Sequence, residues 1–264
     1  MIKTTKKFAF LILLSGLTAC GETLLNEEKT HDSDEGISQL TSAEKPDFRA
    51  IVDVNQKKAA FFDYLRPAVE HENQRIERER QFLLELQAKV ESGESIDNES
   101  LAYSEKLGNV YKVALNSDSV TLGWFNVMLK RVDVLPEELV LSQAANESGW
   151  GTSRFAVEGN NYFGQWCYRK GCGLVPSART TGATHEVATF ESAYLSVQAY
   201  FMNVNRNRAY SELRDIRAAQ RVAGQIIEGV NLAEGLSRYS ERGHAYVDEI
   251  QSMITHNKKY WRQG

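Results

Sequence analysis

Hydrophobic residues recur every three or four positions over much of the chain beyond residue 50, the spacing that lets one face of an α-helix pack against a core. After Gly164 this period is lost, and the Val-Ala-Thr-Phe run at 187–190 is typical of a short strand. The pattern predicts an α+β fold that is mostly helical, with a β-hairpin or irregular flap after Gly164. Helices are expected within residues 50–115, 122–132 and 136–148 and in three segments beyond residue 191.

Breaks in the pattern set the expected ends of several helices. Pro67 is a site where the first helix would kink or divide, and Gly93 marks an interruption at residues 92–98.

Beyond residue 191 each of three segments carries one apolar face. These faces are formed by Tyr194, Val197, Phe201 and Val204, then by Val222, Ile226, Ile227 and Val230, and finally by Val247, Ile250 and Ile254.

The helix at 136–148 places one carboxyl group against the interior. Pro136 suits the first turn of a helix, and Gly149 and Gly151 suit its end. Glu147 follows Val140 by nearly two turns, so both side chains point the same way. Burial and the negative end of the helix dipole both raise the pKa of such a carboxyl. A carboxylic acid that keeps its proton near neutral pH can serve a glycosidase as general acid.

Composition narrows the class of protein. The chain has 264 residues and a net charge of −4, and its Lys and Arg residues are interspersed with acids, so nucleic acid is not an expected partner. Residues 21–46 are poor in apolar side chains and predict a disordered tether. We expect residues 47–116 to form a helical extension that packs on a main domain at 117–264.

The first twenty residues have the features of a signal peptide. Three lysines precede a short apolar run at residues 8–14. The Leu-Thr-Ala-Cys sequence that ends at Cys20 resembles the lipobox of bacterial lipoproteins, which implies lipidation of Cys20 and a membrane anchor. Gly21 in place of an aspartate then implies the outer membrane, facing the periplasm. An ordinary signal peptide and a buried helix are the alternatives.

Two further runs carry a family resemblance. The sequence from Leu141 to Gly151, Leu-Ser-Gln-Ala-Ala-Asn-Glu-Ser-Gly-Trp-Gly, is followed by Asn-Asn-Tyr-Phe-Gly at 160–164. Together they resemble the signature of bacterial N-acetylglucosaminidases that cleave peptidoglycan, and residues 160–176 resemble the Bax-like branch of that family. The resemblance implies a lysozyme-like fold and an endo-β-N-acetylglucosaminidase acting on the β-1,4 bonds of peptidoglycan glycan strands. Glu147 would protonate the leaving oxygen, and no metal or cofactor is implied.

The resemblance also suggests partners for this acid. Glu186 corresponds to a glutamate on the family's mobile hairpin and would activate water or stabilise the cation. Glu158 and Glu191 are weaker alternatives, and assistance by the sugar's own N-acetyl group would need no second carboxylate. Tyr239 resembles a late tyrosine that lies close to the catalytic glutamate, although the Ser-Glu-Arg-Gly run after it differs from the usual Ala-Thr-Asp-Pro.

Aromatic side chains crowd the region after Glu147. Sugar rings present apolar C–H faces, so aromatic walls suit a glycan site. We expect Tyr162 and Trp166 to face the groove and Phe163 to be buried. Asn161 and Gln165 are candidates to hydrogen-bond the sugar substituents.

The cysteines favour an exported protein. Cys167 and Cys172 are most simply a disulfide that stiffens the flap, and Cys20 accounts for the third cysteine. A zinc site would need more ligands at suitable spacing, and a redox pair is more often Cys-x-x-Cys.

Two other functions fit the same pattern. A lytic transglycosylase needs one glutamate alone, and a wall-binding or assembly lipoprotein could keep the groove without turnover. A metal-dependent amidase is disfavoured because the five histidines form no ligand cluster.

Overall fold

The computed structural model describes residues 36–115, 119–177, 179, 182 and 184–261 of the chain. The expected signal peptide, the lipidation site at Cys20 and most of the expected tether lie outside the described residues. Residues 36–42 are helical, and residues 40–264 form one compact unit. Within that unit the Lys45 ammonium donates to the carbonyl oxygen of Val157, at 2.6 Å. Regular structure thus begins before residue 47, inside the segment predicted to be a tether.

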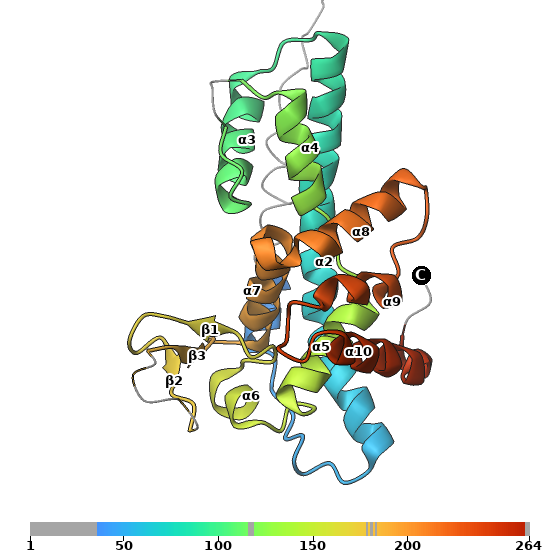
Figure 1. The fold of residues 1–264 in the computed structure, drawn as a ribbon. Helices are drawn as coiled ribbons and strands as arrows, with labels where there is room; N and C mark the ends of the chain where they lie inside the picture. The colour runs from blue at the N-terminus through green and yellow to red at the C-terminus, as the bar shows by residue number, and fades with distance from the viewer. Residues whose placement is uncertain (1–35, 116–118, 178, 180–181, 183, 262–264) are drawn as a thin grey trace, which may run out of the picture. The chain divides into compact units, whose positions relative to one another are not determined.

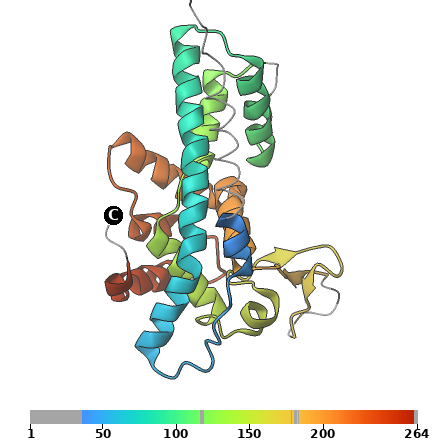
Figure 2. The same cartoon turned by 180° about the vertical axis from the view of Figure 1, so that it is seen from behind.

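The longest helix, α2, runs from Val54 to Ser92 and packs against α4, α5 and α7 (Figures 1 and 2). Asp53 caps its start by accepting from the Gln56 N–H, and Gly93 ends it with a φ of 79°. Pro67 lies inside the helix and does not divide it. The helical hydrophobic period expected within residues 50–115 is confirmed here, because Phe61, Leu65 and Val69 are fully buried.

Three shorter helices follow: α3 (Asn98–Val110), α4 (Leu122–Arg131) and α5 (Glu137–Ser148). Each lies where the hydrophobic period predicts a helix. Since α2 contacts α4, α5 and α7, the expected extension at 47–116 and the expected main domain at 117–264 share one core within the unit.

A helix of six residues, α6 (Arg154–Gly159), leads into the flap, which is a small antiparallel sheet. Its strands are β1 (Trp166–Cys167), β2 (Gly173–Leu174) and β3 (Glu186–Ala188), in the order β1-β3-β2. A Cβ on Gly173 would lie 1.9 Å from the Val187 carbonyl oxygen, so this pairing requires glycine. The predicted flap is confirmed, with three short strands in place of one hairpin.

The rest of the chain returns to helices. They are α7 (Ala193–Arg206), α8 (Ser211–Val222), α9 (Gly229–Leu232) and α10 (His244–His256), with 3-10 turns at Arg208–Tyr210, Ala233–Leu236 and Lys258–Tyr260. The apolar faces predicted for the first and last of these segments are confirmed, as α7 and α10 bury them. None of the helices within the described residues combines the length and apolar character needed to cross a bilayer.

The middle apolar face predicted beyond residue 191 is wrong. Val222 is 91% exposed and Ile226 is 83% exposed, because α8 ends at Val222 and the chain turns at Gly224 with a φ of 65°. The face that α8 buries contains Leu213 together with polar and charged side chains. Arg217 belongs to that face and is 1% exposed, and its guanidinium group donates to backbone carbonyls near Asp133.

Candidate active site

Glu147 lies in the last turn of α5, where the helix reaches the surface. Val140 and Ala144 on the same helix are fully buried, whereas Glu147 is half-buried. Gly149 ends the helix in the left-handed region, with a φ of 56°, as its sequence position predicts. Burial raises the pKa of the Glu147 carboxyl above its ordinary value. The carboxyl can therefore hold a proton at a higher pH than a solvated glutamate does.

A chain of hydrogen bonds fixes this carboxyl from the protein side. The Tyr246 hydroxyl on α10 donates to Glu147 Oε1 at 2.8 Å. Gln143 Nε2 donates to the Tyr246 oxygen at 3.0 Å, and the Tyr200 hydroxyl on α7 donates to Gln143 Oε1. Three helices thus set the direction in which the carboxyl points. Neither Tyr246 nor Gln143 was among the predicted site residues, although Gln143 precedes Glu147 by four residues on the same helix face.

Tyr239 lies beside this chain. Its ring stacks on that of Tyr246, with centroids 5.0 Å apart and planes at 15°. Its hydroxyl donates to the Phe163 carbonyl oxygen at 2.9 Å. The structure therefore places Tyr239 next to Glu147's hydroxyl donor, with its own hydroxyl bonded to the Asn-Asn-Tyr-Phe-Gly loop.

Asn161 shapes that loop. Its side-chain nitrogen donates to the carbonyl oxygens of Gln165 and Ala188, each at 2.9 Å, and its oxygen accepts the N–H groups of Phe163 and Gln165. The side chain is buried, so the structure gives it a role in the loop in place of the expected sugar contact. The loop brings Gly164 to the carboxyl: a Cβ there would lie 3.7 Å from Glu147 Oε2.

The neighbouring aromatic residues divide between core and surface. Tyr162 is fully buried and packs against Phe61 of α2, at 6.1 Å between ring centroids, which corrects the expectation that it faces the groove. Phe163 is buried as predicted and stacks on Tyr200 at 4.1 Å. Trp166 is 56% exposed, as expected for a groove residue, and stacks on His185.

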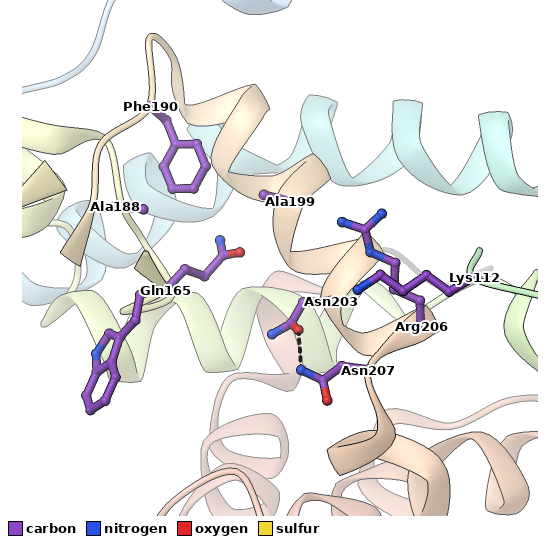
Figure 3. Close-up of a pocket in the computed structure, with 9 residues that line it drawn as sticks. Lys112, Gln165, Ala188, Phe190, Ala199, Asn203, Arg206 and Asn207 are labelled. Atoms are coloured by element: carbon purple, nitrogen blue, oxygen red, sulfur yellow. Dashed lines mark hydrogen bonds between the residues drawn. The ribbon is translucent and has the colours of Figure 1, made fainter. Parts of the chain in front are cut away.

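Two cavities lie beside residues of the candidate site. One has a volume of about 360 Å³ and is lined by Gln165 and Trp166 together with residues of α7 (Figure 3). The other, of about 440 Å³, lies between α2, α5 and α10 and is lined by Trp150, with the Lys58 ammonium 5.0 Å from the centre of that ring. Gln165 and Trp166 are therefore the predicted sugar ligands that face open space.

Glu186 begins β3 and closes the turn of the flap. Its two carboxylate oxygens accept the backbone N–H groups of Gly171 at 3.0 Å and Gly173 at 2.9 Å. These hydrogen bonds lower the pKa of Glu186, so the group is an anion at neutral pH. The structure thus fixes the Glu186 carboxylate at the flap turn. The alternatives Glu158 and Glu191 are both exposed.

The predicted disulfide between Cys167 and Cys172 is confirmed and spans the same turn. Among the described residues, these two sulfurs and Glu186 are the one group of three donor atoms close enough to share a metal ion. Because the sulfurs are bonded to each other, they are not thiolates, and the group does not suit a metal.

Comparison with known proteins places this site in a family. The glucosaminidase family, described as mannosyl-glycoprotein endo-beta-N-acetylglucosaminidase, matches residues 124–259, which include α5, the flap and α10. The chain is also 31% identical over 218 residues to protein Bax of Escherichia coli (strain K12), covering 83% of this chain and 76% of that protein. No solved structure matches the chain.

The chain therefore belongs to the glucosaminidase family as a Bax-like member. Its mostly helical fold with a small antiparallel sheet is the lysozyme-like α+β fold expected from the sequence. A glucosaminidase domain is a domain of the glycan-hydrolase type.

Proposed function

We propose that this protein is a peptidoglycan hydrolase that cleaves the β-1,4 glycosidic bond after N-acetylglucosamine. The observation that carries the proposal is the Glu147 carboxyl: burial raises its pKa, Tyr246 orients it through Oε1, and the Gly164 loop lies beside Oε2. It sits inside the part of the chain that matches the glucosaminidase family. A protonated carboxylic acid at such a site is suited to donate to a leaving oxygen.

In the proposed reaction Glu147 gives its proton to the oxygen of the scissile bond as that bond to C1 of N-acetylglucosamine breaks. The positive charge that develops at C1 is then met by water, which adds its hydroxyl to C1 and returns a proton to Glu147. The hydrogen bond from Tyr246 stabilises the carboxylate that forms after the proton has left.

The positive charge that develops at C1 must be stabilised, either by Glu186 or by the substrate's own N-acetyl group. The two mechanisms differ in whether the flap has to rearrange. Glu186 is an anion, but both of its oxygens are held by the backbone of the flap turn. Stabilisation of the cation by the substrate's N-acetyl group requires no rearrangement of the flap. The geometry therefore favours substrate assistance, and we expect Glu186→Gln to lower turnover far less than Glu147→Gln does.

The test is digestion of purified peptidoglycan by residues 21–264 and by the Glu147→Gln variant, with the products identified by mass spectrometry. Reducing N-acetylglucosamine ends from the unmodified protein alone would support the hydrolase. Anhydro-sugar ends would instead assign a lytic transglycosylase. Absence of products from both proteins, with binding to the glycan retained, would assign a wall-binding or assembly protein.

We also propose that the protein is anchored through lipidated Cys20 to the outer membrane and faces the periplasm. The signal-like residues 1–20 support this, and the Cys167–Cys172 disulfide suits an oxidising compartment. Fractionation of cells that express the protein or its Cys20→Ser variant tests it. Equal membrane association of the two proteins would contradict the anchor.

A further inference from the structure

The cavity of about 360 Å³ beside the flap has a size that suits part of a ligand, and its lining is unusually polar for such a site. Gln165 and Trp166 come from the flap, Asn203 and Arg206 come from α7, and Lys112 comes from the turn after α3. Figure 3 shows Lys112 and Arg206 together at one end of the cavity and Gln165 at the other. None of the described residues that line it is acidic.

Lys112 and Arg206 give the cavity a local positive charge, although the whole chain carries a net charge of −4. Within the described residues, neither side chain forms an ion pair with a carboxylate. Two neighbouring cations repel each other, so their proximity is unfavourable unless an anion lies between or beside them. The cavity is therefore suited to an anionic group.

The surrounding structure holds the Arg206 side chain and the Lys112 backbone in place. Arg206 donates to the Val110 carbonyl oxygen at the end of α3, at 3.2 Å. The Lys112 carbonyl oxygen accepts from Arg131 Nη1 at 3.1 Å, which fixes its backbone while its side chain remains exposed. The backbone of Lys112 has a φ of 58°, a region that favours glycine or asparagine at the end of a helix. Backbone geometry alone therefore gives no reason for a lysine at this position.

Contacts connect the other end of the cavity with Glu147. Gln165 directly follows Gly164, the residue that lies against the Glu147 carboxyl. Asn203 Nδ2 also donates to the Tyr210 hydroxyl at 3.4 Å, and the Tyr210 ring lies 6.1 Å from that of Tyr239. Gln165 and Asn203 thus connect the cavity with residues that surround Glu147.

We propose that this cavity binds a carboxylate of the peptide stem attached to the muramic acid of peptidoglycan, with Lys112 and Arg206 as the cationic pair. The inference rests on the proposed function, since it concerns the substrate of the same site. In a stem-bearing strand the lactyl carboxyl of the sugar is consumed in the amide to the peptide, so the free carboxylates belong to the stem. Lys112 lies in the helical segment before the family match, which gives that segment a part in substrate choice.

A purely structural role for Lys112 and Arg206 predicts a different experimental result. Both lie at helix C-termini, those of α3 and α7, where positive charge compensates the helix dipole. In that role their removal lowers the thermal stability of the protein but does not change its preference among substrates. Substrate preference is therefore the quantity to measure.

The experiment compares two soluble glycan strands that differ only at the stem carboxylates: strands with native peptide stems, and the same strands with these carboxylates converted to neutral amides. The ratio of kcat/KM for native over amidated strands is measured for the unmodified protein and for Lys112→Gln/Arg206→Gln. We expect the double variant to lower this ratio about tenfold, the scale of a lost charge-assisted hydrogen bond. Lys106→Gln, an exposed lysine of α3 outside the cavity, removes a similar charge and should keep the ratio.

A binding measurement separates this inference from the proposed function. Calorimetry with the Glu147→Gln variant compares its affinity for native and amidated stem-bearing fragments, with and without the Lys112→Gln/Arg206→Gln changes, and requires no turnover. Preference for native stems that is lost in the combined variant supports the site even if no hydrolysis is seen. Equal affinities for both fragments, or a melting temperature that falls without any change in preference, would overturn it.

Discussion

Two glutamates of the site illustrate how the environment of a single residue decides its chemistry. Burial raises the pKa of Glu147, whereas two backbone N–H groups lower that of Glu186. One carboxyl is thereby favoured as a proton donor and the other is kept as an anion. Such a separation is typical of acid and base pairs in enzymes, but here the anion is bonded to the flap turn.

The hydrogen bond from the Tyr246 hydroxyl affects the pKa of Glu147, and a single substitution removes it. A hydroxyl that donates to Glu147 stabilises its ionised form and so opposes the effect of burial on its pKa. Tyr246→Phe should therefore raise this pKa further. Because the general acid acts when protonated, activity falls as pH rises through the pKa, and the variant should move that fall to higher pH. The pH profile of kcat/KM on peptidoglycan measures the shift.

Tyr103→Phe serves as the matched control, since the Tyr103 ring packs edge-on against Phe82, at 4.7 Å between ring centroids, and Tyr103 is not among the groups that shift the pKa of Glu147. A profile of Tyr246→Phe that coincides with that of the unmodified protein, or moves to lower pH, would contradict the assignment of Glu147 as the group whose protonation limits activity.

At the scale of elements, α8 packs through charged as well as apolar side chains. The Asp133 carboxylate, in the link before α5, is 2% exposed and lies near the guanidinium groups of Arg80 at 3.4 Å, Arg217 at 4.0 Å and Arg221 at 2.8 Å. Two of these arginines belong to α8 and one belongs to α2. A single buried anion therefore joins three segments of the chain.

Removal of that anion should destabilise the fold strongly. Asp133→Asn leaves the buried Arg217 and the partly exposed Arg80 and Arg221 without their counter-charge. Loss of one partner of a buried ion pair typically costs about 3–5 kcal/mol of unfolding free energy. Asp215→Asn removes the exposed partner of Lys130, and such a surface pair contributes less than about 1 kcal/mol. Urea unfolding followed by circular dichroism compares the two. Similar midpoints for both variants would show that the cluster adds little stability.

At the scale of the whole molecule, the unit formed by residues 40–264 depends on α2. Phe61 and Phe62 of this helix are fully buried and pack edge-on against Trp150, at 5.7 and 5.3 Å between ring centroids. Trp150 follows Glu147 by three residues, so the helix supports the turn that ends α5. The segment expected to be an extension is part of the scaffold of the site.

A fragment of residues 117–264 should therefore fail to fold alone. It would expose the apolar faces of α5 and α7 that α2 covers, and the loss of that burial exceeds the net stability of a typical domain. Residues 40–264 form one compact unit and should keep a cooperative thermal transition. Circular dichroism during heating measures both fragments. A cooperative transition for 117–264 would show that the catalytic segment has an independent core.

The local pattern of residues was enough to predict much of the secondary structure of this protein. Hydrophobic period located α2, α5, α7 and α10, and Gly93 and Gly149 marked two helix ends, because these features depend on neighbours within a few turns. The position of Glu147 at the end of α5 followed from the same reasoning. The disulfide was also predictable, because its two cysteines lie five positions apart.

Partners across long stretches of chain were decided by the tertiary structure alone. Tyr246 lies 99 positions after Glu147, and no local pattern shows that its hydroxyl reaches that carboxyl. Asn161 and Tyr162 stand in a sequence typical of a glycan site, yet α2 and the flap enclose them. Arg217 is buried in α8 because a distant segment supplies backbone carbonyls and Asp133. Side-chain type and spacing determine which groups can face the interior, whereas the packing of distant helices decides which of them meet.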